Sequence, residues 1–425
     1  MQRSLDEWLD YQLTTHVRSV DLGLARVGEV WRRLGAPRPA RTVITVAGTN
    51  GKGSTVAFLE AMVRAAGLRC GAYTSPHLLR YNERVRVLGA DADDAALVGV
   101  FERIEAARGD LALTYFEFGT LAALLLFADA DLDVAILEVG LGGRLDAVNL
   151  VDADVAVITT IALDHQDWLG NDRDAIGREK AGVARAGHVV VVGEADPPRG
   201  LVEELARIGA IAWRAGADFR IDVDARGWHW QSDDIRYDVP AAALAAPCQP
   251  ANAAAAIAAL HALRDRLPIG AAAIAQGIAQ AHVAARLQRH AAGRGELVID
   301  VAHNPQAAGV LAQWLSEQGD GRRVIAVFGA LGDKDIAGIL AQLAKHVDAW
   351  HLAGLERDSP RGLDAAALRE RFAPGVDATL HDSVDAALDA TQSALSEGAR
   401  VVAFGSFFVA APALRWARRH SFCAG

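Results

Sequence analysis

The sequence has few cysteines and no long apolar segment, and both shortages limit what the protein can be. Its three cysteines, Cys70, Cys248 and Cys423, are widely separated in 425 residues. This spacing fits neither a disulfide framework nor a zinc site, and it favours a reducing compartment. The longest apolar run, near "LAALLLFA", is too short to cross a bilayer and predicts a buried helix instead. The first residues, "MQRSLDEWLDYQ", are charged and lack the apolar core of a signal peptide. We therefore expect a cytoplasmic protein with no membrane partner.

An excess of positive charge is also missing. The chain has 43 Lys and Arg against 53 Asp and Glu, so its formal net charge is −10. This balance excludes the basic footprint of a nucleic-acid-binding protein, although it allows a small anionic substrate. Hydrophobic residues make up 52% of the chain, as in a globular protein, and its length predicts two domains.

Residues 47–55, "AGTNGKGST", predict a phosphate-binding loop. The apolar, β-branched segment 42–46 precedes them as a predicted strand, and a helical pattern follows that ends near Gly67. In such a turn, glycines let the backbone approach an anion, and Lys52 can reach terminal phosphates. The general pattern places a glycine where this chain has Val46 and a hydroxyl where it has Gly53. Taken alone, so loose a match favours a glycine-rich strand-to-helix turn with a solvated lysine.

The first half of the chain alternates predicted strands and helices. The predicted strands lie within 42–48, 133–140, 154–163 and 188–193, and between residues 218 and 239 the pattern changes to period two. Alternation predicts a mostly parallel sheet covered by helices, and period two predicts a small antiparallel meander. An Ala-rich helix is predicted at 252–263.

Polar and Gly-rich residues at 289–296 interrupt this pattern, and a new β/α series follows. We place the domain boundary there. The predicted fold class is α/β: an N-terminal P-loop ATPase-like domain (1–288) with a mostly parallel sheet and the meander, and a C-terminal Rossmann-like α/β domain (289–425). The second half lacks a phosphate loop of its own, so we expect it to close over the first.

Three further polar residues lie near predicted strand ends or their loops. Glu138 interrupts an apolar strand, where a carboxylate is costly unless it binds a cation or accepts hydrogen bonds. His165 ends "TTIALDH"; taken alone, it is more often a hydrogen-bonded structural histidine than a ligand. Lys180 lies in "GREKAGVARAG" and, taken alone, is an ordinary surface lysine.

Seven strings together carry a resemblance. They are "AGTNGKGST", "YTSPHLLRYNERVRV", "TYFEFGT", "ILEVGLGGRLDAVN", "IALDHQDWLG", "GREKAG" and "IDVAHNP". In this order and spacing, the chain resembles bacterial bifunctional dihydrofolate synthase/folylpolyglutamate synthase enzymes of the Mur ligase superfamily. The resemblance extends from "DLGLARV" to "FGSF", and the loop of that family has the same Gly-Lys-Gly-hydroxyl form.

The resemblance implies an ATP-dependent amide ligase. ATP would phosphorylate a carboxylate, and the amine of L-glutamate would displace phosphate. The implied partners are the small molecules dihydropteroate, tetrahydrofolates, L-glutamate and ATP. The protein is expected to be a monomer. The implied cofactor is one or two Mg²⁺ ions, with a monovalent cation as a further candidate. The strings "DLGL" and "TYFE" match the bifunctional enzymes better than those that only add glutamates to folates.

The resemblance also implies site residues. The implied catalytic residues are Lys52, His165, Lys180 (carbamylated by CO₂) and His303. The implied ATP contacts are Gly48, Thr49, Asn50, Gly51, Lys52, Gly53, Ser54, Asn252, Arg286 and Asp300. The implied metal ligands are Ser54, Ser75, Glu138 and His165. The implied pterin contacts are Asp21, Leu22, Gly23, Thr114, Tyr115, Phe116, Glu117, Leu145, Asp146 and Ala147. The chain departs from the family before Arg286, where Ala-Ala replaces Pro-Gly, and before Asn252, where an extra alanine follows the proline. Tyr115 and Phe116, each taken alone, fit core positions equally well. In the second domain, 329–335 and Ser406 resemble a glutamate-receiving or ATP-closing region.

Two other functions fit part of the sequence. A ligase acting on a nucleotide-linked cell-wall precursor would share the phosphate loop, but we expect no additional N-terminal domain for that nucleotide before residue 48. A nucleotide-hydrolysing switch would share the loop and Glu138. It would give no reason for Lys180, Asp300 and the pterin strings to occur together.

Overall fold

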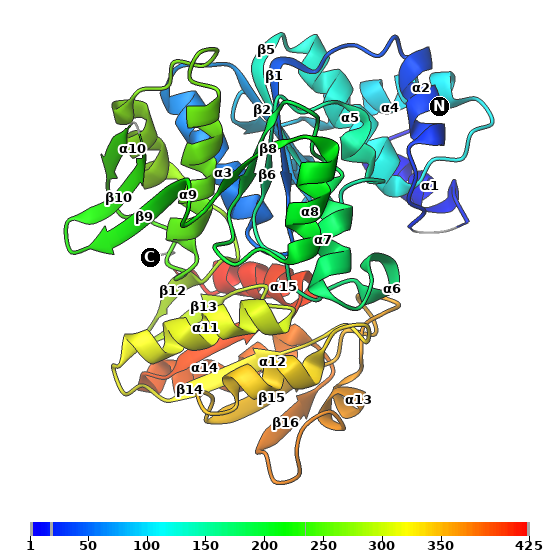
Figure 1. Cartoon of the computed structure of the whole chain (residues 1–425). Helices are drawn as coiled ribbons and strands as arrows, with labels where there is room; N and C mark the ends of the chain where they lie inside the picture. Colours follow the sequence, from blue (N-terminus) through cyan, green and yellow to red (C-terminus); the bar gives the residue numbers. More distant parts are fainter. Residues whose placement is uncertain (1–2, 18–19, 234, 423–425) are drawn as a thin grey trace. The chain divides into compact units, whose positions relative to one another are not determined.

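The computed structural model describes residues 3–17, 20–233 and 235–422, which form two compact units. The first unit comprises residues 1–243 and 250–282, and the second comprises 244–249 and 283–425. The predicted start of the second domain, residue 289, lies just inside the second unit. Figure 1 shows the elements of both units. Cys70 and Cys248 are free thiols, and Cys423 lies outside the described residues.

An eight-stranded sheet forms the centre of the first unit, in the order β4-β3-β2-β5-β1-β6-β7-β8. β3 and β4 are antiparallel to their neighbours, and the other strands pair in parallel. The strands are β1 Ala40–Ala47, β2 Cys70–Tyr73, β3 Val85–Val87, β4 Ala90–Asp91, β5 Leu132–Glu138, β6 Val155–Ile158, β7 Val189–Val192 and β8 Ile211–Arg214. This confirms the predicted mostly parallel sheet. The predicted strand 154–163 is too long, because β6 ends at Ile158 and the following residues bond to the phosphate loop instead.

Helices cover both faces of this sheet, as in other α/β folds. α3, with α10 packed on it, lies on one face, and α5, α7 and α8 lie on the other (Figure 1). Val43 and Ala47 of β1 join the core cluster that contains the α5 side chains, and the equally buried Ile44 and Val46 lie on the opposite face. The helices are α1 Leu5–Thr14, α2 Ala25–Arg33, α3 Lys52–Ala65, α4 Asp94–Arg108, α5 Tyr115–Asp129, α6 Gln166–Leu169, α7 Arg173–Ala181, α8 Arg199–Ile208, α9 Gln249–Ala262 and α10 Ala271–Gln280, with 3₁₀ turns at Tyr81–Arg84 and Ala147–Leu150.

A three-stranded antiparallel meander completes the first unit. It consists of β9 Phe219–Asp224, β10 Gly227–Ser232 and β11 Arg236–Val239, as the period-two pattern predicts. Trp230 of β10 is fully buried, and its indole N–H donates to the carbonyl oxygen of Ala254 on α9 at 3.1 Å. This bond anchors the meander to the Ala-rich helix.

The second unit contains a six-stranded sheet in the order β12-β13-β17-β14-β15-β16. The five predicted strands are present as β13 Gly295–Ile299, β14 Val324–Phe328, β15 Ala349–Ala353, β16 Ala378–His381 and β17 Arg400–Phe404. The helices are α11 Pro305–Gln318, α12 Ile336–Leu343, α13 Ala365–Arg369, α14 Val384–Glu397 and α15 Phe407–Arg419. The stretch 289–296, which predicted a break in the pattern, instead forms most of β12 (Gln288–Ala292) and the start of β13 in an antiparallel hairpin.

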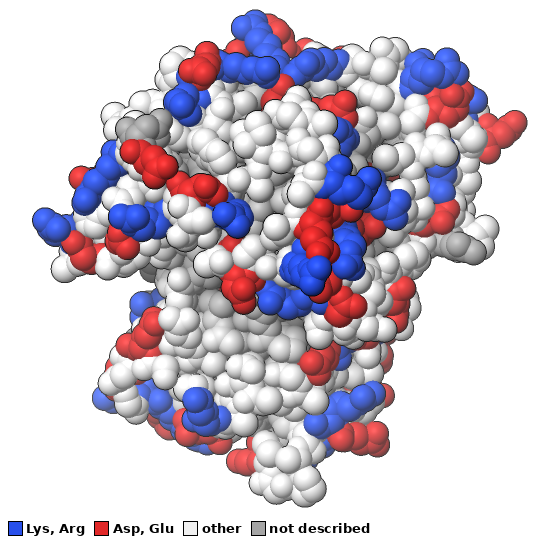
Figure 2. All heavy atoms as spheres, in the orientation of Figure 1, with Lys and Arg blue, Asp and Glu red and all other residues white. Residues whose placement is uncertain are grey.

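Acidic and basic side chains are mixed on the face shown in Figure 2, where neither sign forms a continuous patch among the described residues. In the described part of the chain, no helix is both long and apolar enough to span a membrane.

Candidate active site

The predicted phosphate loop connects the end of β1 to the start of α3. Gly51 is the N-cap of α3 and has φ +87°, a conformation that side-chain-bearing residues rarely adopt. Lys52 begins the helix, and its Nζ donates to the carbonyl oxygens of Gly48 (3.1 Å) and Thr49 (3.2 Å). The first turn of α3 and this ammonium group therefore lie together, an arrangement that suits phosphate oxygens because they are attracted to a helix N-terminus and to positive charge.

Two threonines that follow β6 hold the loop in place. The hydroxyl group of Thr159 donates to the carbonyl oxygen of Asn50 at 2.6 Å. Thr160 accepts the N–H of Thr49 on its carbonyl oxygen (2.7 Å) and the N–H of Asn50 on its hydroxyl (3.1 Å). A side chain at Gly48 would overlap the hydroxyl of Thr159, so glycine is required there for this packing as well as for its φ of +146°. The loop therefore has a fixed shape before any ligand binds.

Asn252, a predicted ATP contact on α9, lies against the same loop. A Cβ atom at Gly51 would overlap the side-chain oxygen of Asn252. The structure thus places this amide beside the helix N-terminus that the phosphates would approach.

Glu138, the last residue of β5, lies beside the loop because β5 pairs with β1 and Glu138 is opposite Val46. Its carboxylate is buried, and Oε2 accepts the N–H of Ser75 at 3.1 Å. A Cβ atom built at Gly53 would lie 3.9 Å from that oxygen. This packing brings the Glu138 carboxylate against Ser75 and against the first turn of α3, which contains Ser54. Carboxylate and hydroxyl oxygens suit Mg²⁺, a cation that prefers oxygen ligands.

The fourth predicted metal ligand is placed differently. His165 is the exposed N-cap of the short helix α6 and has a left-handed backbone (φ +52°). Among the described residues, no group of three or more His, Cys, Asp or Glu side chains could hold a metal ion. The carboxylate and hydroxyl set around Glu138 is therefore the part of the prediction that the geometry supports best.

Lys180 is buried, contrary to the expectation for an ordinary surface lysine. It lies on α7, and its Nζ donates to the carbonyl oxygen of Gly48 at 2.9 Å. Burial, followed by repulsion from Lys52, lowers the pKa of Lys180 to about 7. A substantial fraction of this amine is therefore neutral near pH 7.

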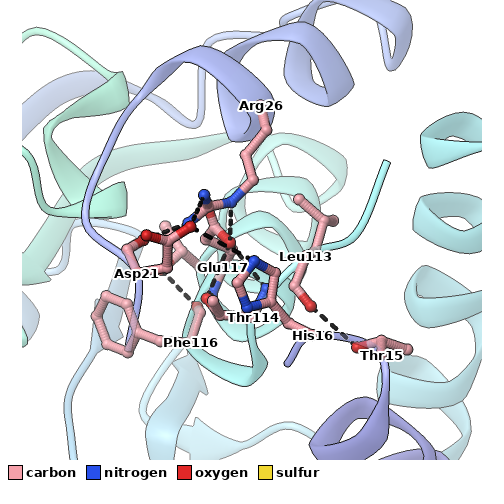
Figure 3. Close-up of polar contacts among 9 residues, drawn as sticks. Thr15, His16, Asp21, Arg26, Leu113, Thr114, Phe116 and Glu117 are labelled. Atoms are coloured by element: carbon pink, nitrogen blue, oxygen red, sulfur yellow. Dashed lines mark hydrogen bonds and ion pairs between the residues drawn. The ribbon is translucent and has the colours of Figure 1, made fainter. Parts of the chain in front are cut away.

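Three predicted pterin segments come together beside the sheet. The N–H of Gly23 donates to the carbonyl oxygen of Leu145 at 3.2 Å. Arg26 of α2 pairs with Asp21 and with Glu117, whose Oε1 lies 2.9 Å from the Arg26 Nε. Figure 3 shows Arg26 extending between these two carboxylates. Residues 21–23 are thus joined to 145–147 by a backbone hydrogen bond and to 114–117 through Arg26.

Two carboxylates inside this region have different environments. Glu117 accepts the N–H (2.8 Å) and hydroxyl (2.9 Å) of Thr114 in a capping box at the start of α5. Asp146 accepts the N–H groups of Leu141 (2.8 Å) and Val148 (2.9 Å). Burial raises the pKa of Asp146 to about 6, although these hydrogen bonds oppose the shift.

Tyr115 and Phe116 are half-buried and pack against the edge of the core, so each side chain is only partly shielded from solvent. The Phe116 ring lies so close to Gly140 that a Cβ atom there would come within 2.6 Å of it. Tyr115 meets Tyr81 edge to face, with ring centroids 5.7 Å apart. Both rings therefore lie at the boundary between the core and solvent.

In the second unit, two of the remaining predicted residues lie beside one aromatic ring. The guanidinium of Arg286 lies 5.8 Å from the centroid of Phe407, and the ring of His303 lies 6.3 Å from it. The buried carboxylate of Asp300 accepts the N–H groups of Leu287 and Ala302, each at 2.8 Å. Burial raises the pKa of Asp300, while Arg286 and the hydrogen bonds lower it in part.

Sequence reasoning missed several residues that shape these sites. Thr159 and Thr160 were assigned to a strand, and Arg26 and Phe407 were not singled out. Phe407 directly follows Ser406 in "FGSF", which was a detectable signal. Thr159 and Thr160 bond to partners distant in the sequence, so no local pattern marks them. Arg26 lies within "DLGLARV", but its contact with Glu117 joins segments far apart in the chain.

Comparison with known proteins gives a consistent result. The Mur ligase middle domain family matches residues 46–260, and the Mur ligase glutamate ligase domain family matches residues 285–407. The dihydrofolate synthase/folylpolyglutamate synthase of Escherichia coli is 47% identical over 96% of this chain and 94% of its own length. The protein of the same name from Mycobacterium tuberculosis is 34% identical over 89% of this chain and 84% of its own.

Solved structures agree. Escherichia coli FolC in complex with DHPP and ADP superposes with a TM-score of 0.93, at 45% identity and 99% coverage of both chains. A bifunctional folylpolyglutamate synthase/dihydrofolate synthase from Yersinia pestis, complexed with AMPPNP and a Mn ion, gives a TM-score of 0.89, at 47% identity and 98% coverage of both chains. The chain therefore belongs to the Mur ligase superfamily and, within it, to the dihydrofolate synthase/folylpolyglutamate synthase family.

Proposed function

We propose that this protein joins L-glutamate to 7,8-dihydropteroate to give dihydrofolate, and adds further glutamates to tetrahydrofolates, at the expense of ATP. The names of its relatives support both activities, and Escherichia coli FolC is described in complex with DHPP and ADP. The observation in this chain that carries the proposal is the joining of residues 21–23, 114–117 and 145–147 in the unit that holds the phosphate loop. A nucleotide-hydrolysing switch needs the loop but not that assembly.

In the first step, a carboxylate oxygen of the pterin substrate attacks the γ-phosphorus of ATP. The bond from that phosphorus to the β–γ bridging oxygen breaks, and ADP leaves as an acyl phosphate forms. Phosphoryl transfer depends mainly on positioning and charge stabilisation. The N–H groups at the start of α3 and the ammonium of Lys52 supply both, and Thr159 and Thr160 hold these donors in place.

In the second step, the amine nitrogen of L-glutamate attacks the acyl carbon. The carbon–oxygen bond to phosphate breaks, inorganic phosphate leaves, and the amine proton passes to solvent or a nearby base. An anionic group near the amine would orient the ammonium form of glutamate on arrival.

We propose that carbamylated Lys180 supplies this anion. A neutral lysine amine adds to CO₂, forms a nitrogen–carbon bond and releases one proton, which converts the neutral amine into an anionic carbamate. The reaction requires an unprotonated amine, and the buried Lys180 has a pKa lowered to about 7. Its hydrogen bond to the carbonyl oxygen of Gly48 supports a modification beside the phosphate loop.

Mg²⁺ would be held by Ser54, Ser75, Glu138 and His165, and when bound it supplies charge neutralisation of the triphosphate. Of these residues, Glu138 and Ser75 are joined directly by a hydrogen bond. We further propose that Asn252, Arg286, Asp300 and His303 contact ATP, which is supported by their clustering within each unit.

The predicted pterin residues then line the site of the acceptor substrate, with Tyr115 and Phe116 as its aromatic wall. We propose that the enzyme acts as a monomer in the cytoplasm, a reducing compartment that its three widely separated cysteines fit.

Phosphate release from Mg-ATP and L-glutamate tests the function, with dihydropteroate in one reaction and tetrahydrofolate in another. Release in both, dependent on glutamate, is the expected result. Release with dihydropteroate alone would remove the second activity, and release with tetrahydrofolate alone would remove the first. ADP formation that is indifferent to both pterin and glutamate would contradict ligation and favour a switch.

A further inference from the structure

A buried ion pair connects the helix of the phosphate loop to the chain segment that carries Ser75. Glu60 lies on α3 and Arg86 on β3. The Nε and Nη2 atoms of Arg86 both contact Oε2 of Glu60, at 2.9 and 2.8 Å, and the Glu60 side chain is only 9% exposed. Taking two charges out of water is costly, so a buried pair is weak evidence for a role in stability alone.

The remaining nitrogen of Arg86 contacts the segment on the other side. Nη1 donates to the hydroxyl of Thr74 and to the carbonyl oxygen of Glu83, both at 3.2 Å. Thr74 immediately precedes Ser75, whose N–H donates to Glu138. A single guanidinium group therefore links α3 to both ends of residues 74–83, which we call the Ser75 loop.

The Ser75 loop is also organised internally. The carboxylate of Glu83 accepts three successive backbone N–H groups, those of Leu78, Leu79 and Arg80, at 2.8, 3.0 and 2.9 Å. The loop thus behaves as one body, and a displacement at its Arg86 attachment would move Ser75 as well.

Arg86 remains positively charged despite its burial. Burial lowers its pKa, but attraction to Glu60, with smaller contributions from Asp91 and Glu138, outweighs burial and leaves the pKa raised. Because Glu138 is among these contributors, the field of Arg86 extends to the carboxylate that accepts the Ser75 N–H. The charge of Arg86 in the Glu60–Arg86 pair therefore interacts with Glu138, one of the candidate metal ligands.

We propose that Glu60 and Arg86 are positioning residues that fix the Ser75 loop to the phosphate-loop helix and so set Ser75 against Glu138 for divalent-cation binding. This inference rests on the proposed function of Ser75 and Glu138 as metal ligands. In this proposal, the helix that carries Lys52 sets the geometry of the metal site. It acts through the Glu60–Arg86 salt bridge, which contacts neither metal nor substrate.

The test measures Mn²⁺ affinity in the presence of AMPPNP by electron paramagnetic resonance, which requires no turnover. R86M removes the bridge, and R86K retains charge without the paired nitrogens. T74V removes the hydroxyl that accepts from Arg86, together with its 3.4 Å hydrogen bond to the carbonyl oxygen of Glu83. R108M is the matched control, because Arg108 forms a partly buried ion pair with Glu105 at 2.7 Å on α4, apart from the loop.

We expect R86M and T74V to weaken Mn²⁺ binding by about tenfold or more, the range seen when the partners of metal ligands are lost. R86K should lie between R86M and the wild type, and R108M should match the wild type. Equal Mn²⁺ affinity in wild type, R86M and T74V would overturn the proposal; if R86M does not fold, T74V decides. Failure of the proposed function is distinguishable, because it would appear in the unaltered chain as glutamate-independent ADP formation.

Discussion

Lys52 and Lys180 donate hydrogen bonds to the same acceptor, the carbonyl oxygen of Gly48, at 3.1 and 2.9 Å. Two lysines on one oxygen repel each other if both are charged, and Lys52 is the second largest cause of the lowered pKa of Lys180, after burial. The arrangement favours one ammonium and one neutral amine. It is thereby compatible with the two proposed roles, a phosphate-binding charge at Lys52 and a nucleophilic amine at Lys180.

The first prediction concerns stability. Lys180 has a pKa of about 7 in the fold and about 10.4 when unfolded, so the unfolded state binds more protons between these values. The free energy of unfolding therefore rises with pH between these two pKa values. The cost of burying the charged Lys180 side chain is fully present below pH 7. We expect K180M to be more stable than the wild type at pH 7, by on the order of 1–3 kcal/mol, with the advantage shrinking toward pH 10. Denaturant unfolding in CO₂-depleted buffer measures this, and an advantage independent of pH would contradict it.

The second prediction concerns the modification of the same residue. Protein incubated with ¹³C-labelled bicarbonate should show a carbamate carbon signal by nuclear magnetic resonance that is absent from K180A. K180A should also lose turnover by about 100-fold or more, an effect typical of removing one stabilising group from an active site, and short-chain carboxylates should restore part of it. K345A, at an exposed lysine of the second unit, should retain both signal and turnover. A K180A enzyme with undiminished turnover would remove this role.

Strand prediction worked where strands are β-branched and buried on both faces, as in 42–46 and 189–192. It failed for β2, whose four residues "CGAY" include a glycine, and for the two-residue β4, because such short segments carry no usable period. It also extended β6 too far. Thr159 and Thr160 have high strand propensity, but their hydroxyls and carbonyls bond to the phosphate loop.

The site residues were identified largely from motif order, and the structure adds how they are held. A pattern match could name Gly51 but could not show that Asn252 fills the space where its side chain would be. It could name Asp21 and Glu117 but not the Arg26 that joins them. Such contacts form between residues far apart in the sequence. The local periodicity of hydrophobic residues cannot predict them. The buried state of Lys180 is of the same kind.

The third prediction follows from the attachment of the phosphate loop. T159V removes the hydroxyl that donates to Asn50, a loss of about 1 kcal/mol for a typical hydrogen bond. If the loop must keep its shape to bind phosphates, the Kd for ADP should rise about fivefold, as measured by calorimetry. T391V is the matched control, since Thr391 is a buried threonine whose hydroxyl donates to a helix carbonyl at 2.8 Å in the second unit. Equal ADP affinity in both variants would show that the bond only stabilises the fold.

The fourth prediction concerns Arg26, which pairs with Asp21 and Glu117 and so joins two of the three pterin segments. R26Q leaves the nearly buried Glu117 without its guanidinium partner, and leaving a buried polar group unsatisfied costs about 1–3 kcal/mol. Because residues 21–23 and 114–117 would then be free to separate, we expect the KM for dihydropteroate to rise about tenfold or more while the KM for ATP stays unchanged. R32Q is the control: Arg32 lies on the same helix, its side chain is 72% exposed, and it pairs with Glu29. If R26Q instead raised the KM values for ATP and dihydropteroate equally, Arg26 would serve the stability of the first unit and not the assembly of a pterin site.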